Sequence, residues 1–234
     1  MKHLKKLSVN PIPVIAIDGP SASGKGTVAE RVASQLGFHY LDSGALYRIV
    51  ALAGKKHQIN WSDGQALSLL IPKLEIMFKD AAVFLDGQDI SQEIRSPEIG
   101  NGASQVAIHP EVRNALFELQ HSFRQPPGLV ADGRDMASVV FRDAVLKIFL
   151  TANVEERANR RFKQLTANNI EADFDEILQD LKARDLRDST RSSAPLIQTK
   201  EAILLNTDNL NIAQAVDFIL SKYESFQQKQ SSQQ

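Results

Sequence analysis

The sequence has no cysteine, which excludes disulfides, thiolate metal sites and a cysteine nucleophile. Its five histidines are scattered without metal-ligand spacing, so we expect them to be structural or exposed. No hydrophobic run reaches the roughly 18 residues that a transmembrane helix requires. The apolar run that follows the N-terminal lysines is broken by Pro11 and Pro13 and stops at Asp18, which argues against a signal peptide.

Neither sign of charge is in excess. The chain has 27 basic and 28 acidic residues, for a net charge of −1. This balance argues against broad binding to nucleic acid or to a membrane surface. We therefore expect a cytoplasmic protein with neither kind of partner. With 234 residues, the chain is long enough to bury a core of its own.

The most informative stretch present is IPVIAIDGPSASGKGT, residues 12–27. A β-prone run ends at Asp18, and a glycine-rich loop with a lysine leads into a helical pattern. Such a loop points its N–H groups at one centre and binds phosphate with the help of the helix dipole and Lys25. The predicted nucleotide-binding residues are Gly19, Pro20, Ser21, Ala22, Ser23, Gly24, Lys25, Gly26 and Thr27.

A hydroxyl usually follows the lysine of this motif directly, but here Gly26 intervenes and the hydroxyl is on Thr27. We expect Thr27 to contact Mg²⁺ together with nucleotide phosphates and water. Asp18 and Asp132 each follow a short apolar run. Either carboxylate could hold waters of the Mg²⁺ ion or cap backbone N–H groups, and the sequence leaves both roles open.

Short apolar runs alternate with amphipathic segments along the chain. The predicted strands are Val14–Asp18, Phe38–Leu41, Leu129–Ala131, Leu146–Leu150 and Ile203–Asn206, and the predicted helices include Thr27–Leu36, Ala45–Ala53, Val112–Phe123 and Val154–Leu165. This order is typical of an α/β fold with a parallel sheet covered on both faces. Asp18, Asp42 and Asp132 should then converge at the carboxyl edge of the sheet, where ligands bind.

Two segments interrupt the alternation. Residues 71–95 read as a small antiparallel insertion with a hairpin turn at Asp86 and Gly87. Residues 154–194 read as a helical lid ending in an arginine-rich flap. The core would comprise residues 12–70, 96–153 and 195–226. Residues 1–11 and 227–234 would be flexible tails, the second because QQKQSSQQ is polar and repetitive.

Arginines gather at predicted strand ends and in the flap. They are Arg48, Arg134, Arg160, Arg161, Arg184, Arg187 and Arg191. Phosphoryl transfer spreads negative charge over oxygen atoms, and guanidinium groups bind such oxygens in a fixed geometry. A flap that carries arginines would also exclude water, which competes with the acceptor. The combination therefore favours a kinase.

Four segments together resemble bacterial cytidylate kinases: IDGPSASGKGT, LDSGALYR, ADGRDM and RDLRDSTRSSAPL. The resemblance runs over nearly the full chain. It implies the P-loop NTPase three-layer fold of nucleoside-monophosphate kinases, with a five-stranded parallel sheet, a small antiparallel insertion and a helical lid. It also implies a monomer that transfers the γ-phosphate of ATP, with Mg²⁺, to CMP or dCMP.

The resemblance assigns roles by matching positions. Arg48, Arg134 and Arg191 would hold the acceptor phosphate; Ser104, Arg113 and Asp135 would read the base; Ser43, Arg184 and Asp188 would lie near the sugar; Arg160 and Arg161 would follow the transferring group. Lys25, Arg134, Arg160, Arg161 and Arg191 would be the catalytic residues.

The assignment to the base agrees with its chemistry. Asp135 can accept from the amino group of cytosine, while Arg113 and Ser104 donate to ring acceptors; uracil reverses two of these groups. Alternatively, Asp135 is a structural partner of Arg134. Other functions also remain open, namely another P-loop kinase of the UMP or shikimate type, or a P-loop ATPase or switch.

Overall fold

The computed structural model describes residues 12–79, 82–167 and 170–232. Its main sheet has the order β2-β6-β1-β7-β8, and every neighbouring pair is parallel. These strands are β1 (Val14–Asp18), β2 (His39–Asp42), β6 (Leu129–Gly133), β7 (Leu146–Thr151) and β8 (Ile203–Asn206). All five predicted strands are confirmed, with ends that differ by at most two residues. The expected flexible tail at residues 1–11 lies outside the described residues.

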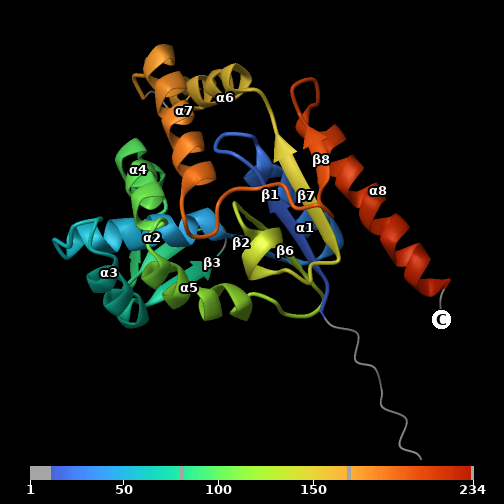
Figure 1. Ribbon diagram of the computed structural model, residues 1–234, viewed down its shortest axis with the longest axis horizontal. Coiled ribbons are helices and arrows are strands. Elements are labelled where there is room, and N and C mark those ends of the chain that lie inside the picture. The colour runs from blue at the N-terminus through green and yellow to red at the C-terminus, as the bar shows by residue number, and fades with distance from the viewer. Residues whose placement is uncertain (1–11, 80–81, 168–169, 233–234) are drawn as a thin grey trace, which may run out of the picture.

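Helices cover both faces of this sheet, as Figure 1 shows. One face packs on α1 (Lys25–Leu36) and α8 (Ile212–Ser231). The other packs on α2 (Ser43–Lys56) and on α3 (Gly64–Leu70), α4 (Pro97–Val106) and α5 (Pro110–Ser122). Successive side chains of β1 point to opposite faces of the sheet, which explains the two helix layers. Ile15 and Ile17 face α1 and α8, while Val14 and Ala16 face α2. The expected three-layer fold is confirmed.

The insertion forms a second, antiparallel sheet of β3 (Ile76–Lys79), β4 (Ala82–Leu85) and β5 (Gln88–Asp89). Asp86 and Gly87 form the two-residue turn between β4 and β5, with φ of 50° and 78°. Positive φ at both central positions is the geometry that an Asp-Gly hairpin turn favours. The predicted hairpin turn is therefore confirmed.

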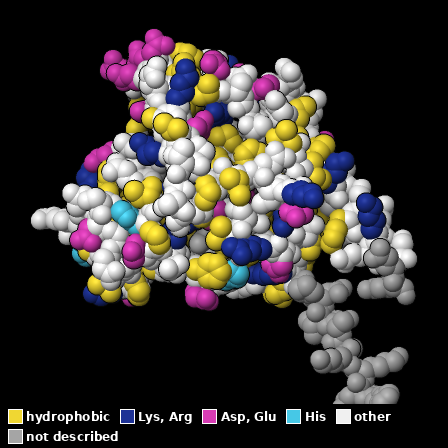
Figure 2. Space-filling view, viewed as in Figure 1, with side chains coloured by type: hydrophobic (Ala, Val, Ile, Leu, Met, Phe, Trp, Pro, Cys, Tyr) yellow, Lys and Arg dark blue, Asp and Glu magenta, His cyan; other side chains and the backbone are white. Residues whose placement is uncertain are grey.

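Two helices lie above the carboxyl edge of the main sheet (Figure 1). They are α6 (Val154–Ala167) and α7 (Phe174–Thr190), and they occupy the predicted lid. None of the described helices combines the length and the hydropathy needed to cross a membrane. On the face in Figure 2, lysines and arginines are interspersed with acidic side chains.

The expectation of disorder from residue 227 is wrong for the next turns of the chain, because α8 continues to Ser231. A capping box between Asn211 and Gln214 starts this helix, and buried residues such as Ile219 and Tyr223 hold it on the sheet. Gln and Lys have good helix propensity, so a polar end can extend a helix that is already anchored.

The sheet also fixes the entry to the glycine-rich loop. A Cβ atom added to Gly19 would lie 1.9 Å from the carbonyl oxygen of Leu150 on β7. The carbonyl group of Leu150 belongs to the backbone of a central strand and cannot easily move aside. We therefore expect Gly19→Ala to lower the free energy of unfolding by about 3 kcal/mol. Urea unfolding measures this change.

Gly37→Ala provides a matched control for that experiment. Gly37 has φ 65° but no atom within 4 Å of its added Cβ, so the expected loss is only about 1 kcal/mol. Equal losses in the two variants would show that the close approach at Gly19 does not matter.

Candidate active site

The glycine-rich loop between β1 and α1 forms one wall of a pocket of about 540 Å³. Gly24 takes the left-handed conformation (φ 89°) at the start of α1, which the missing Cβ allows. The buried Lys25 curls back, and its Nζ donates to the carbonyl oxygen of Pro20 at 3.2 Å. The helix therefore begins at the pocket with its N–H groups and its cation side by side, an arrangement suited to phosphate.

The pocket brings together nearly all the predicted site residues. Those that line it are Ser21, Ala22, Ser23, Gly24, Lys25, Gly26, Thr27, Ser43, Arg48, Ser104, Arg113, Arg134, Asp135, Arg161, Arg184, Asp188 and Arg191. They come from the phosphate loop, from α1, α2, α4, α5, α6 and α7, and from the residues that follow β6 and α7. Three predicted residues are not in the lining: Gly19 and Pro20 lie at the base of the loop, and Arg160 binds elsewhere.

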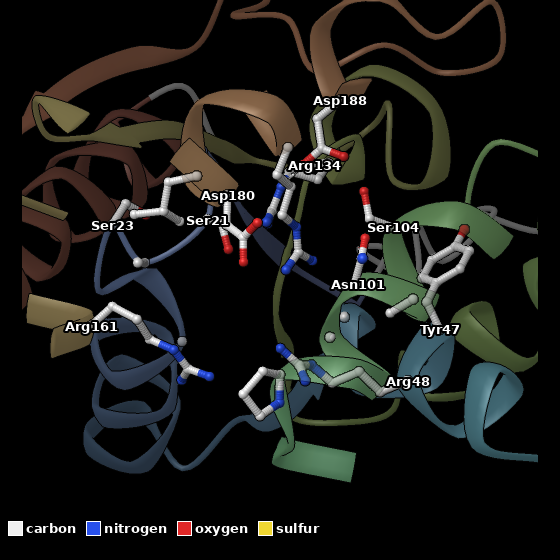
Figure 3. Close-up of a pocket in the computed structure, with 18 of the residues that line it drawn as sticks. Ser21, Ser23, Tyr47, Arg48, Asn101, Ser104, Arg134, Arg161, Asp180 and Asp188 are labelled. Atoms are coloured by element: carbon white, nitrogen blue, oxygen red, sulfur yellow. Dashed lines mark hydrogen bonds and ion pairs between the residues drawn. The ribbon is translucent and has the colours of Figure 1, made fainter. Parts of the chain in front are cut away.

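Three arginines from separate elements point into the same space. Figure 3 shows the guanidinium groups of Arg48, Arg134 and Arg161 converging from different sides of the pocket. Arg48 is fixed by a 2.7 Å hydrogen bond from its Nη1 to the carbonyl oxygen of Ile94, in the segment that joins the insertion to α4. Such a cluster repels itself and is suited to a ligand with several negative charges.

In the same pocket, Arg113 on α5 and Asp135 form a buried ion pair. Arg113 also donates to the carbonyl oxygen of Ala107 at 3.1 Å and lies over the ring of Tyr47, 5.5 Å from its centroid. The alternative in which Asp135 pairs with Arg134 is wrong. The chain bends after Gly133, and Arg134 pairs with Asp188 on α7 while Asp135 pairs with Arg113.

Arg134 binds the lid. Its Nε donates to the carboxylate of Asp188 on α7 at 2.8 Å. Two further arginines in the pocket are incompletely satisfied. Among the described residues, Nε of Arg184 and Nη2 of Arg191 have no hydrogen-bond partner, although Nη2 of Arg191 forms a longer ion pair with Asp135 at 3.8 Å. A ligand that brings oxygen acceptors would supply the missing partners.

The electrostatics of the pocket follow from this crowding. Burial lowers the pKa of Lys25, and the neighbouring Arg134 lowers it further. The same two causes lower the pKa of Arg184. On the other side, burial and the nearby Asp42 raise the pKa of Asp132. Without a ligand, each of these cations therefore disfavours the charged form of its neighbours. A bound polyanion would stabilise the charged forms.

The two candidate carboxylates differ in role. Asp18 accepts hydrogen bonds from the backbone N–H groups of Met136 and Ala137, both at 2.8 Å, and it does not line the pocket. Its role is to cap this turn and so fix the Arg134–Asp135 segment. Asp132 lines the pocket, and its Oδ1 accepts from the hydroxyl of Tyr40 at 2.7 Å.

Thr27 and Asp132 offer oxygen ligands beside the phosphate loop, which fits a Mg²⁺ ion carried by a nucleotide. Among the described residues, no group of three or more His, Asp or Glu side chains could hold a metal by itself.

Arg160 is not in the pocket lining, and its guanidinium is held by carbonyl groups and by the side chains of Glu156 and Thr207. It donates to the carbonyl oxygens of Ser23 at 3.1 Å and Thr207 at 2.7 Å, so it ties α6 to the loop and to the chain after β8. The arginine spacing on α6 could not distinguish this role from that of Arg161, because both belong to the same basic turn.

Sequence reasoning gave no role to several residues that shape the site. On α7, Arg187 donates to Asn101 Oδ1 at 3.1 Å and to Ser104 Oγ at 3.4 Å, which joins the lid to α4. Its spacing from Arg184 and Arg191 was a usable signal, because residues three or four apart share a helix face. Nothing in the sequence indicated Asn101.

Comparisons with known proteins agree with this geometry. The family model for cytidylate kinase matches residues 15–225. A cytidylate kinase from Polynucleobacter asymbioticus is 59% identical over 93% of this chain and 99% of its own. Those from Chromobacterium violaceum and Burkholderia pseudomallei are 55% and 53% identical over 94% of this chain, and over 98% and 96% of their own. With a family model that matches most of the chain and relatives above 50% identity over nearly their full length, the chain belongs to the cytidylate kinase family.

Proposed function

We propose that this protein transfers the γ-phosphoryl group of ATP to CMP or dCMP, which yields ADP and CDP or dCDP. The observation that carries the proposal is one pocket that is lined both by the phosphate loop and by the buried Arg113–Asp135 pair. The loop suits a nucleoside triphosphate, and the same pocket holds a hydrogen-bonding pair that can read a base and several arginines that can bind phosphate. The family supports the same reaction.

On the donor side, the N–H groups of the loop and Lys25 would bind the β- and γ-phosphates of ATP. Arg161 on α6 points into the pocket and would neutralise charge on the transferring group (Figure 3). Thr27, with Asp132 acting through water, would hold the Mg²⁺ that accompanies ATP. When bound, this ion would supply positive charge that offsets the negative charge of the phosphates.

On the acceptor side, Arg48, Arg134 and Arg191 would bind the phosphate of CMP. This phosphate needs no general base, because its second pKa is near 6 and it is already an oxyanion at neutral pH. The arginines then contribute by aligning the attacking oxygen with the γ-phosphorus and by neutralising charge. Ser43, Arg184 and Asp188 would lie near the sugar.

At the base, Asp135 would accept a hydrogen bond from the 4-amino group of cytosine, and Arg113 and Ser104 would donate to its ring acceptors. Uracil presents a carbonyl oxygen to the carboxylate and an N–H to the guanidinium. Each mismatch leaves a buried polar group unpaired, at a cost of about 1–3 kcal/mol. Discrimination against uracil should therefore come from this pair.

An ADP-release assay with ATP and Mg²⁺ tests the proposal directly. The acceptors are CMP, dCMP, UMP, AMP, GMP and shikimate, with a control that has no acceptor. We expect release with CMP and dCMP alone. Release without an acceptor would instead indicate an ATPase, and release with shikimate or UMP alone would indicate a different kinase.

The base-reading role of Asp135 gives a sharper prediction. We expect kcat/KM of the wild type to favour CMP over UMP by about 100-fold, and Asp135→Asn to reduce this ratio to about 10-fold or less. The reason is that the asparagine amide can turn to donate to O4 of uracil. Kinetics with both acceptors measure the ratio.

Asp143→Asn is the matched control, since Asp143 also pairs with an arginine, Arg124 at 2.8 Å, but lies outside the pocket. A CMP to UMP ratio that is unchanged in Asp135→Asn would refute the assignment of Asp135.

A further inference from the structure

Arg157 on α6 is an almost fully buried arginine, 5% exposed, that does not line the pocket. Its Nε donates to the carbonyl oxygen of Ala152, just after β7, at 3.0 Å. Its Nη1 donates to the carbonyl oxygen of Ser21 in the phosphate loop at 3.1 Å. The side chain therefore joins the lid to the edge of the sheet and to the loop.

The same guanidinium binds α7 through a two-pronged ion pair. Nη1 and Nη2 of Arg157 donate to the two carboxylate oxygens of Asp185 at 3.1 and 2.5 Å. Bidentate pairs of this kind fix orientation as well as distance. A movement of the Ser21 carbonyl would thus be transmitted to α7 through a rigid, planar group.

Asp185 lies on α7 directly after Arg184 and three residues before Asp188, and both of these neighbours line the pocket. Asp188 is itself held by Arg134 at 2.8 Å. Helix α7 is therefore attached through Arg157 to the loop and through Asp188 to the segment that follows β6. Residues 184–188 of α7 therefore connect the phosphate loop to the segment that follows β6.

We propose that Arg157 is a positioning residue that couples binding of the donor nucleotide at the loop to binding of the acceptor against α7. The inference rests on the function proposed above. Phosphates bound to the loop N–H groups set the orientation of the Ser21 peptide, Arg157 follows its carbonyl, and Asp185 then places Arg184 and Asp188 for the acceptor. A lysine at position 157 cannot make this connection, because it lacks the fork.

Isothermal titration tests the coupling without turnover. The dissociation constant of CMP is measured with and without AMP-PNP and Mg²⁺, an ATP analogue that does not transfer its terminal phosphoryl group. In the wild type we expect the analogue to tighten CMP binding at least about fivefold. In Arg157→Lys and in Asp185→Asn, this factor should fall below about twofold.

The ratio separates coupling from a loss of structure, since a generally damaged site would weaken CMP binding equally with and without the analogue. Arg124→Lys is the matched control: Arg124 also donates both to a carboxylate, Asp143, and to a backbone carbonyl, Ile12, but away from the pocket. It should retain the wild-type factor. Asp185→Asn keeps the test available if Arg157→Lys fails to fold.

A factor near one in the wild type, or a wild-type factor in both variants, would overturn the inference while phosphoryl transfer to CMP stands. Failure of the wild type to phosphorylate CMP in the ADP-release assay would overturn the proposed function instead. The titration would then use the acceptor active in that assay, and a tightening that Arg157→Lys abolishes would still support the coupling.

Discussion

Replacing Lys25 with methionine should reduce kcat for phosphoryl transfer to CMP by about 1000-fold. Lys25 is the buried cation at the start of α1, among the loop N–H groups proposed to bind the β- and γ-phosphates of ATP. Methionine preserves the length of the side chain but removes the charge that would be neutralised against the transferring group. Initial rates at saturating ATP and CMP measure the effect.

The same variant should not unfold more easily than the wild type at pH 7. Burial and Arg134 lower the pKa of Lys25 to about 7, so the unfolded chain binds the proton more tightly than the folded protein. The wild type therefore gains stability as the pH rises from 7 toward 10.5, and Lys25→Met should lose this gain. Urea unfolding at pH 7 and 9 tests both statements.

Lys55→Met provides the control for both measurements. Lys55 forms an exposed ion pair with Glu98, and such a pair contributes little to stability. The Lys55→Met variant should therefore leave kcat and the pH dependence of the free energy of unfolding unchanged. Full activity of Lys25→Met, or a lower unfolding midpoint than the wild type at pH 7, would contradict the role given to this lysine.

Arg134→Ala should reduce kcat/KM for CMP by at least about 100-fold. Arg134 is proposed to bind the acceptor phosphate, and it also fixes Asp188 on the lid through the 2.8 Å hydrogen bond. Its loss would remove a ligand of the phosphate and loosen the helix that carries Arg184. Steady-state kinetics with varied CMP measure this, and Arg142→Ala, an exposed arginine nearby, serves as control.

Arg134→Ala should also change how stability depends on pH. Burial favours the protonated form of Asp188, but Arg134, Arg184 and Arg191 outweigh it and hold its pKa below the usual value of 3.8. The resulting stability is present above that pH and is lost as the pH falls through the folded-state pKa. Without Arg134 the folded-state pKa of Asp188 lies closer to 3.8, so this acid-dependent loss of stability should become smaller. An unchanged acid limb in urea unfolding, with unchanged kcat/KM, would contradict both roles.

The strands of the main sheet were predictable because each is a short apolar run of β-prone residues that ends at a polar residue or turn. The C-terminal helix was not predictable to its end. Its last turns are polar, and only the packing of Ile219 and Tyr223 against the sheet shows that the helix is anchored before them. Local composition carries no information about such an anchor.

The residues that form the site could be predicted from the sequence, but the pairs that they form with one another could not. Motif positions indicated which arginines and acids gather, since parallel strands end at one edge of a sheet. Which acid meets which arginine depends on the turn after Gly133, which sends Arg134 to Asp188 and leaves Asp135 to Arg113. Capping of backbone N–H groups was one of the two roles left open for Asp18, and the structure selects it. The roles of Arg157 and Arg160 escaped prediction, because both bind backbone carbonyl groups of the phosphate loop that no side-chain pattern identifies.

The two halves of the pocket are built in different ways. The loop that would hold ATP is one continuous stretch, Ser21–Thr27, rooted at the end of the central strand β1. The surfaces that would hold the acceptor are assembled from segments spread between Ser43 and Arg191. A substitution in one of those segments leaves the loop in place. The architecture therefore allows the choice of acceptor to diverge step by step while the phosphate donor stays the same.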